Sequence, residues 1–167
     1  MRALLLAAAA AAAAGCGHQP VEEKSDWERS HAAQLVPSDG DVVLPGYPRE
    51  RELIEFSAGA ASEFRFFVDS ASLSVERDVV RYVLVARSSA GVQNVSFEGM
   101  RCATAEVRIY AVGRAGEWSG KPGPWRAIAP GARSWHSALY REYFCPYREP
   151  IASAREGVDS LRRGGAR

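Results

Sequence analysis

The chain has 167 residues, of which 47% are hydrophobic, 21 are Lys or Arg and 20 are Asp or Glu. The numbers of basic and acidic residues are nearly equal, which gives no electrostatic reason to expect a nucleic-acid partner. The length is sufficient for one domain with its own hydrophobic core.

Residues 1–15 have the features of an export signal. Arg2 supplies a positive charge, and residues 3–14 are uncharged Ala and Leu. A helix of this length rises about 18 Å, whereas a hydrocarbon core is roughly 30 Å thick. We therefore expect a cleaved signal peptide and not a transmembrane helix.

The run Ala13-Ala14-Gly15-Cys16 resembles a lipobox, in which a diacylglycerol is attached to the Cys thiol before cleavage. It predicts that Cys16 is the lipidated first residue of the mature protein; the alternative is ordinary cleavage nearby. Several acyl chains on one residue suffice for stable anchoring. Gly17, and not Asp, follows the Cys. We therefore expect the membrane as a partner through this lipid, and an outer-membrane location facing the periplasm.

The other two cysteines, Cys102 and Cys145, form an even pair, which in an oxidising compartment is most simply a disulfide. It would close a loop of about 44 residues and stabilise the fold by roughly 4 kcal/mol. The alternative is a Cys–His metal site that uses His136. His18 and His31 lie near the N-terminus, and no CxxC or HExxH spacing occurs. We expect no metal and no cofactor.

Composition divides the exported chain into three parts. Residues 16–45 are polar, interrupted by Pro and Gly, and predict a lipidated N-terminus with a flexible tether, with a helical patch at residues 27–35. Residues 46–150 predict an antiparallel β domain with a C-terminal helix. Residues 151–167 predict a charged surface helix or tail.

Short runs rich in Val, Phe, Tyr and Ile predict strands at residues 52–57, 63–69, 72–76, 79–87, 92–102 and 105–112. The run 79–87 has an apolar face made of Val80, Tyr82, Leu84 and Ala86. The run 105–112 alternates between an apolar face of Ala105, Val107, Ile109 and Ala111 and a polar face of Glu106, Arg108 and Tyr110. Residues 88–91 predict a hairpin turn with positive φ at Gly91.

The remainder predicts a loop and two helices. Residues 113–131 are rich in Gly and Pro, and their aromatic side chains should fold back onto the sheet. Ser134 is a candidate N-cap for a helix to Tyr143, with an apolar stripe of Trp135, Leu139 and Tyr143. A second helix at residues 153–163 has only the stripe Ala154, Val158 and Leu161. The fold class is therefore α+β: a single domain with a mainly antiparallel sheet of about five to seven strands and one or two C-terminal helices.

Several motifs between Phe67 and Tyr110 are distinctive enough to indicate a protein family. The most distinctive are Val79-Val80-Arg81-Tyr82 and Asn94-Val95-Ser96-Phe97-Glu98-Gly99-Met100-Arg101-Cys102. Together with Trp125-Arg126-Ala127-Ile128 they resemble the cryptic neisserial protein-like (CNP-like) family of small proteobacterial envelope lipoproteins. The resemblance covers roughly residues 50–150. It implies an envelope location and a shared fold, and it brings no established enzyme activity.

Two groups of side chains are candidate binding residues. Charged residues on or beside strands could form a polar cluster for an anionic or peptide ligand, or only cross-strand ion pairs: Arg81, Glu98, Arg101 and Glu106. Aromatic residues could form a platform for glycan or peptide, or only anchor loops and core: Tyr110, Trp118, Trp125 and Trp135. The candidate binding set is Arg81, Tyr82, Glu98, Arg101, Glu106, Tyr110 and Trp125.

Two functional hypotheses follow. His136 is the only His beyond residue 31, and Trp-His-Ser is not a recognised active-site arrangement, so we expect no enzyme. The first hypothesis is a non-catalytic envelope lipoprotein that binds another envelope protein or supports an assembly. The alternative is a module that binds a small ligand or glycan. A contiguous exposed apolar patch would favour the first, and a concave pocket with converging polar groups the second.

Overall fold

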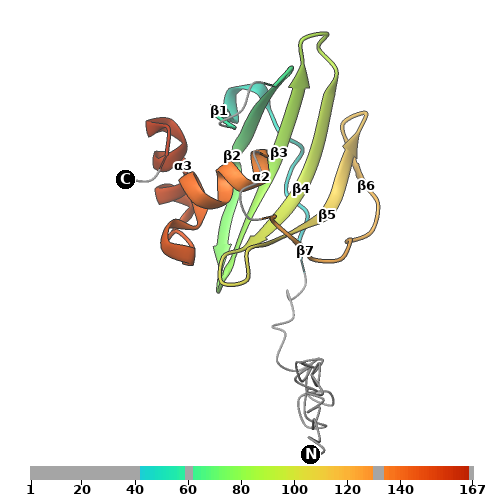
Figure 1. Cartoon of the computed structure of the whole chain (residues 1–167). Coiled ribbons are helices and arrows are strands. Elements are labelled where there is room, and N and C mark those ends of the chain that lie inside the picture. Colours follow the sequence, from blue (N-terminus) through green and yellow to red (C-terminus); the bar gives the residue numbers. More distant parts are fainter. Residues whose placement is uncertain (1–41, 59–61, 130–133, 166–167) are drawn as a thin grey trace, which may run out of the picture. The chain divides into compact units, whose positions relative to one another are not determined.

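The computed structural model describes residues 42–58, 62–129 and 134–165. The predicted signal peptide, Cys16 and the helical patch at 27–35 lie outside these residues. Seven strands form one antiparallel sheet in the order β1-β2-β3-β4-β5-β6, and β7 pairs with β5 (Figure 1). The strands are β1 Leu53–Phe56, β2 Phe64–Glu76, β3 Val79–Ser88, β4 Gln93–Arg101, β5 Glu106–Arg114, β6 Glu117–Ser119 and β7 Arg126–Ala127. The α+β prediction is confirmed.

The predicted strands 63–69 and 72–76 are one strand, β2, with a register irregularity between Asp69 and Ser74. At this point the Ser72 hydroxyl accepts a hydrogen bond from the Val83 backbone N–H at 2.8 Å and donates one to the Asp69 carbonyl at 2.7 Å. The side chain thus replaces a backbone partner, and the pairing with β3 continues past the irregularity.

The segment predicted as a loop, 113–131, also contains the short strands β6 and β7. Its aromatic side chains do fold back onto the sheet as expected. Trp118 donates its indole N–H to the Pro45 carbonyl at 2.7 Å, and its ring lies 5.3 Å from that of Tyr47.

Two apolar clusters bury the two faces of the sheet. The helix face, which the C-terminal helices cover, includes Val80, Tyr82, Leu84 and Met100. The outer face, against which Tyr47 and Trp118 pack, includes Val83, Val85, Phe97 and Ala111. The alternation predicted for residues 79–87 is therefore confirmed.

The alternation predicted for residues 105–112 is wrong at its end. Phe97 pairs with Ala111 but Glu98 pairs with Ile109, so Tyr110 is an extra residue in β5. Because of this bulge, Tyr110 and Ala111 both belong to the outer-face cluster, while Ile109 lies across from Glu98. Ala105 precedes the strand, in a turn with φ of 53°.

The predicted helix after Ser134 is present, and the Ser134 hydroxyl accepts from the Ser137 N–H at 3.2 Å. It begins as α2, Trp135–Ala138, and continues as a π-helix, η2, Leu139–Phe144. Leu139 and Tyr143 are fully buried on the helix face, whereas Trp135 is 38% exposed. Two 3₁₀ turns complete the helical segments: η1 Glu50–Glu52 and η3 Pro146–Arg148.

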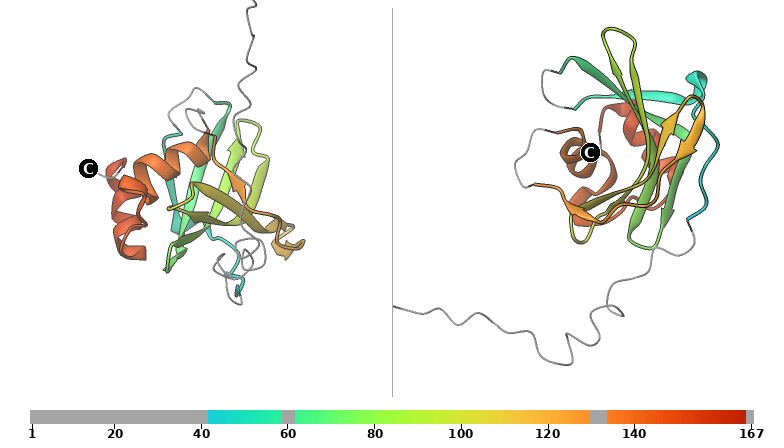
Figure 2. Two further views of the ribbon diagram at one scale, coloured as in Figure 1. Left: turned by 60° about the horizontal axis from the view of Figure 1, so that its bottom comes forward. Right: turned by 90° about the vertical axis from the view of Figure 1, so that its right-hand side faces the viewer.

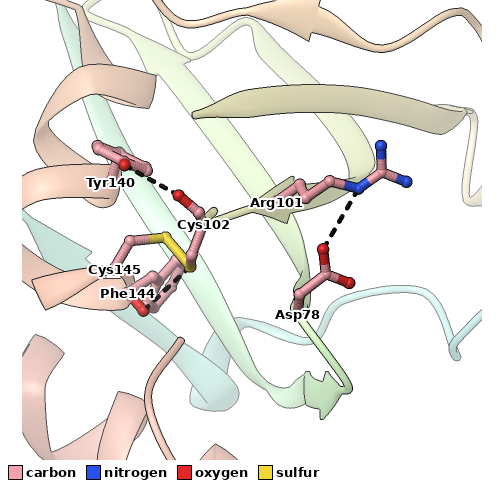
Figure 3. Close-up of a disulfide and its surroundings, with 6 residues drawn as sticks. All are labelled: Asp78, Arg101, Cys102, Tyr140, Phe144 and Cys145. Carbon is pink, nitrogen blue, oxygen red and sulfur yellow. Dashed lines mark hydrogen bonds and ion pairs between the residues drawn. A yellow bond between two sulfur atoms is a disulfide. The ribbon is translucent and has the colours of Figure 1, made fainter. Parts of the chain in front are cut away.

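A disulfide joins Cys102, directly after β4, to Cys145, directly after η2, as the cysteine count predicted (Figure 3). The Tyr140 hydroxyl adds a hydrogen bond to the Cys102 carbonyl at 3.0 Å. Figure 3 also shows that Arg101 points away from the disulfide, towards Asp78. The end of the helix is thus tied to the end of a strand.

The last helix, α3 Ala154–Arg163, is capped by Ser153 and ends at Gly164, whose φ is 80°. Its arginines and Glu156 are exposed, but Leu161 is 2% exposed and belongs to the core. A Cβ at Gly157 would lie 2.5 Å from Leu73 and 2.6 Å from Ile151, so the helix approaches its neighbours closely there. The predicted second helix is thus present, and its apolar stripe packs on the same side of the sheet as α2 (Figure 2). None of the helices in the described ranges is long and apolar enough to cross a membrane.

Candidate functional site

The helices leave one end of the helix face uncovered, and a groove of about 920 Å³ lies there. It lies between the start of β2, the β3–β4 and β5–β6 hairpins and the first turn of α2. Its walls are largely apolar, and the side chains that form them include Phe64, Phe66, Leu84, Ile109, Val112 and Trp135. The volume is in the range of small-molecule sites.

A buried carboxylate, that of Glu98, lies at the base of this groove. Only 3% of its side chain is exposed. Tyr82 donates its hydroxyl to Oε2 at 3.1 Å, and Ser96 donates its hydroxyl to Oε1 at 2.6 Å. The strand pairing brings these residues together, because Tyr82 lies opposite Glu98 and Ser96 is two residues along the same face.

Helix α2 supplies the third partner of the carboxylate. His136 Nε2 lies 2.8 Å from Glu98 Oε2, although the two residues are 38 positions apart. The Ser134 cap fixes the start of the helix, and the Trp135 ring stacks on Phe66 with centroids 5.2 Å apart. These two contacts hold the first turn of α2 over the groove.

The proton on His136 decides which hydrogen bonds form. Its Nε2 lies 3.2 Å from the Trp135 indole N–H as well as 2.8 Å from Glu98. One ring nitrogen cannot both accept from the indole and donate to an ionised carboxylate. When Nε2 carries the proton, it donates to Glu98, and the carboxylate then has three donors.

Burial raises the pKa of Tyr82 well above its ordinary value, and the charge of Glu98 raises it further. The phenol therefore stays protonated and remains a donor to the carboxylate across the physiological pH range. The lining of the groove thus includes a buried hydrogen-bond acceptor that its neighbours hold in place, and the walls suit a hydrocarbon or aromatic body.

The structure divides the predicted binding set between the two faces. Glu98 lines the groove, and Tyr82 is buried beside Glu98 and donates to it. The other five are on the outer face or its edge, and none of them lines the groove: Arg81, Arg101, Glu106, Tyr110 and Trp125. Successive side chains of a strand point to opposite faces of the sheet. The odd positions of β3 and β4, which include Arg81 and Arg101, face away from the helices.

The outer-face residues form ion pairs and ring contacts with one another. Arg81 lies 2.6 Å from Glu76, and Arg101 lies 3.5 Å from Glu106, the residue opposite it on β5. The Arg101 guanidinium lies 4.1 Å from the centroid of the Trp125 ring. These contacts fix the register and the β7 segment.

Sequence reasoning considered His136 only for a Cys–His metal site, which the disulfide between the two cysteines rules out, and it did not place Ser96 in a site. No sequence pattern indicated that His136 would contact Glu98, because this contact depends on how α2 packs on the sheet. A pattern did exist for Ser96. Ser96 and Glu98 are two polar residues at alternate positions of one strand, on the same face of the sheet as the apolar residues of β3. In the described parts of the chain, no group of three or more His, Cys, Asp or Glu could hold a metal ion.

The comparisons with known proteins found one match. The model of the CNP1-like family matches residues 36–162. No curated protein and no solved structure matches the chain.

Proposed function

The chain belongs to the CNP1-like family, and on that premise we propose that it is a non-catalytic lipoprotein of the bacterial envelope that binds a small amphipathic ligand in the groove. One observation carries the proposal: three large apolar side chains are left exposed in the same concavity, above a buried carboxylate. Phe64 is 38% exposed, Ile109 43% and Trp135 38%. Such exposure is typical of binding sites.

The concave form of this surface favours a small ligand over a protein partner. A protein-binding surface would present these side chains as an exposed patch, whereas here they line a groove whose lining also includes Glu98. An envelope protein as partner is the alternative function, and crosslinking in the intact envelope followed by identification of the captured protein tests it.

The contacts of His136 support a non-catalytic role. Covalent catalysis needs a hydroxyl or thiol within hydrogen-bond reach of the base. Within the described residues, the side chain of His136 bonds only to Glu98 and Trp135. The imidazole thus acts as a donor that holds the carboxylate in place.

The envelope location is supported by three features of different kinds. Residues 1–15 have the pattern of an export signal, and Cys16 follows a lipobox-like run. The Cys102–Cys145 disulfide is the kind of bond that persists in an oxidising compartment. Anchoring would place the groove in the periplasm, where envelope metabolites and lipids are in reach.

A fluorescence titration with the neutral apolar probe N-phenyl-1-naphthylamine tests the groove. We expect saturable binding that Ile109→Trp weakens, because the larger side chain fills the groove. Val92→Trp is the matched control, since Val92 is 61% exposed and does not line the groove. Absence of saturable binding, or equal binding by the two variants, would overturn the proposal.

A further inference from the structure

We propose that the groove selects ligands with a cationic head, a primary ammonium on an alkyl or aromatic body, whose N–H groups donate to the Glu98 carboxylate. This inference rests on the proposed function and adds the chemistry of the head group. Glu98 supplies the charge, and the apolar walls take the body of the ligand.

The first argument is the charge of Glu98. Outer-face carboxylates have arginine partners, as in the pairs Glu76–Arg81 and Glu106–Arg101. Among the described residues, the one basic side chain within ion-pair distance of Glu98 is His136. No Arg or Lys in the described part of the chain pairs with Glu98, so this carboxylate has no permanently charged partner, and burying an unpaired charge is costly. An ammonium group would compensate it.

The second argument is the number of hydrogen bonds that the carboxylate can accept. Its two oxygens together have about four acceptor positions. Tyr82 and His136 occupy Oε2, and Ser96 occupies Oε1. Oε1 therefore has capacity for a further donor, and an ammonium can supply it without displacing any of the three.

The third argument is the nature of the walls next to the carboxylate. Trp135 precedes His136 directly and is exposed on the groove, as is Phe64. Aromatic faces attract cations as well as hydrocarbon, and indole does so best. A ligand lying along the groove would have its charge near Glu98 and the indole and its body against Leu84 and Ile109.

Arg114 also lines the groove and would favour an anionic ligand. It is exposed, so water and salt screen its charge. Two charges attract more strongly at the lower effective dielectric of a partly buried site than in water. The buried Glu98 therefore outweighs Arg114 in the choice of charge.

Calorimetric titration of the full chain carrying Cys16→Ala, which removes the lipid attachment point, tests the proposal. The probes are octylammonium, 1-octanol and octanoate, which share one tail and differ in charge. We expect octylammonium to bind about tenfold more tightly than 1-octanol or octanoate. Glu98→Gln should remove this preference. Glu76→Gln, which changes an outer-face carboxylate, is the matched control.

Each outcome decides one of the two proposals. If 1-octanol binds and octylammonium is not preferred, or octanoate is, the cation inference is wrong and the groove proposal stands. If none of the probes binds, the groove proposal itself fails. Should Glu98→Gln not fold, His136→Gln serves, because Gln can still donate to Glu98; the preference for octylammonium must persist in this variant, and its loss would overturn the inference.

Discussion

The ring of Tyr110 occupies the space that a side chain at position 99 would fill. A Cβ on Gly99 would lie 2.6 Å from the Tyr110 hydroxyl oxygen and 2.7 Å from its Cε2 atom. The bulge in β5 brings Tyr110 to this face, and the glycine on β4 makes room for it. The two residues therefore depend on each other.

Gly99→Ala should lower the free energy of unfolding by about 1–3 kcal/mol, the usual cost of overpacking. The aromatic ring is rigid and cannot bend aside as an aliphatic chain end could. Denaturant unfolding measures the change. Gly46→Ala is the control, because a Cβ there meets nothing within 4 Å. Equal stability of the two variants would contradict the packing argument, and Gly99→Ala combined with Tyr110→Leu should recover part of the loss.

Removing the disulfide should destabilise the domain by about 4 kcal/mol, because the cross-link closes a long loop in the unfolded chain. The oxidised protein should migrate faster than the reduced protein in a denaturing gel. Cys102→Ser should abolish this difference and lower the melting temperature, and the double variant with Cys145→Ser should behave in the same way. A reductant-sensitive shift that persists in Cys102→Ser would contradict the pairing.

Cys16→Ala should release the protein from membranes, because the thiol is the predicted site of lipid attachment. Fractionation of cells into soluble and membrane parts, followed by immunoblotting, checks this. Cys102→Ser is a suitable control, since it removes a thiol from the domain and leaves the predicted lipid site intact. A Cys16→Ala protein that stays with the membrane would contradict the anchor.

Stability should fall as the pH rises above about 10, in part because of Tyr82. Its pKa is raised in the folded state by burial and by the Glu98 charge. Between the unfolded and the folded pKa, the folded state holds a proton that the unfolded state has lost, so stability decreases with pH. In denaturant unfolding across this range, Tyr82→Phe should show a shallower decrease. Tyr147→Phe should not, because Tyr147 is 93% exposed; equal slopes for the two variants would refute the assignment.

Local patterns were sufficient for most of the fold. The alternation in residues 79–87 correctly assigned both faces of β3. Ser134 correctly marked the start of a helix, and the range predicted for the second helix, 153–163, agrees with α3. The bulge at Tyr110 could not be predicted from β5 alone, because it is a relation between two strands. For the same reason Asp69–Ser74 looked like a break between strands: only the pairing with β3 shows that Ser72 substitutes for a backbone partner.

The candidate site was predictable only in part. Glu98 and Tyr82 were in the predicted binding set, but they were grouped with Arg81 and Arg101, which face the opposite way. The alternation of even and odd positions along the strands would have been enough to assign the two pairs to opposite faces. His136 could not have been assigned in this way, since no local pattern reports which helix lies over which end of the sheet.

The disulfide also determines what a single cut in the backbone can do. The chain from Cys102 to Cys145, together with the bond between the two sulfurs, is a closed ring. The ring includes β5, β6, β7 and α2, and with them one wall of the groove. A protease that cleaves once inside it opens the ring but releases no fragment. Both pieces stay covalently joined until a second cut or a reductant separates them.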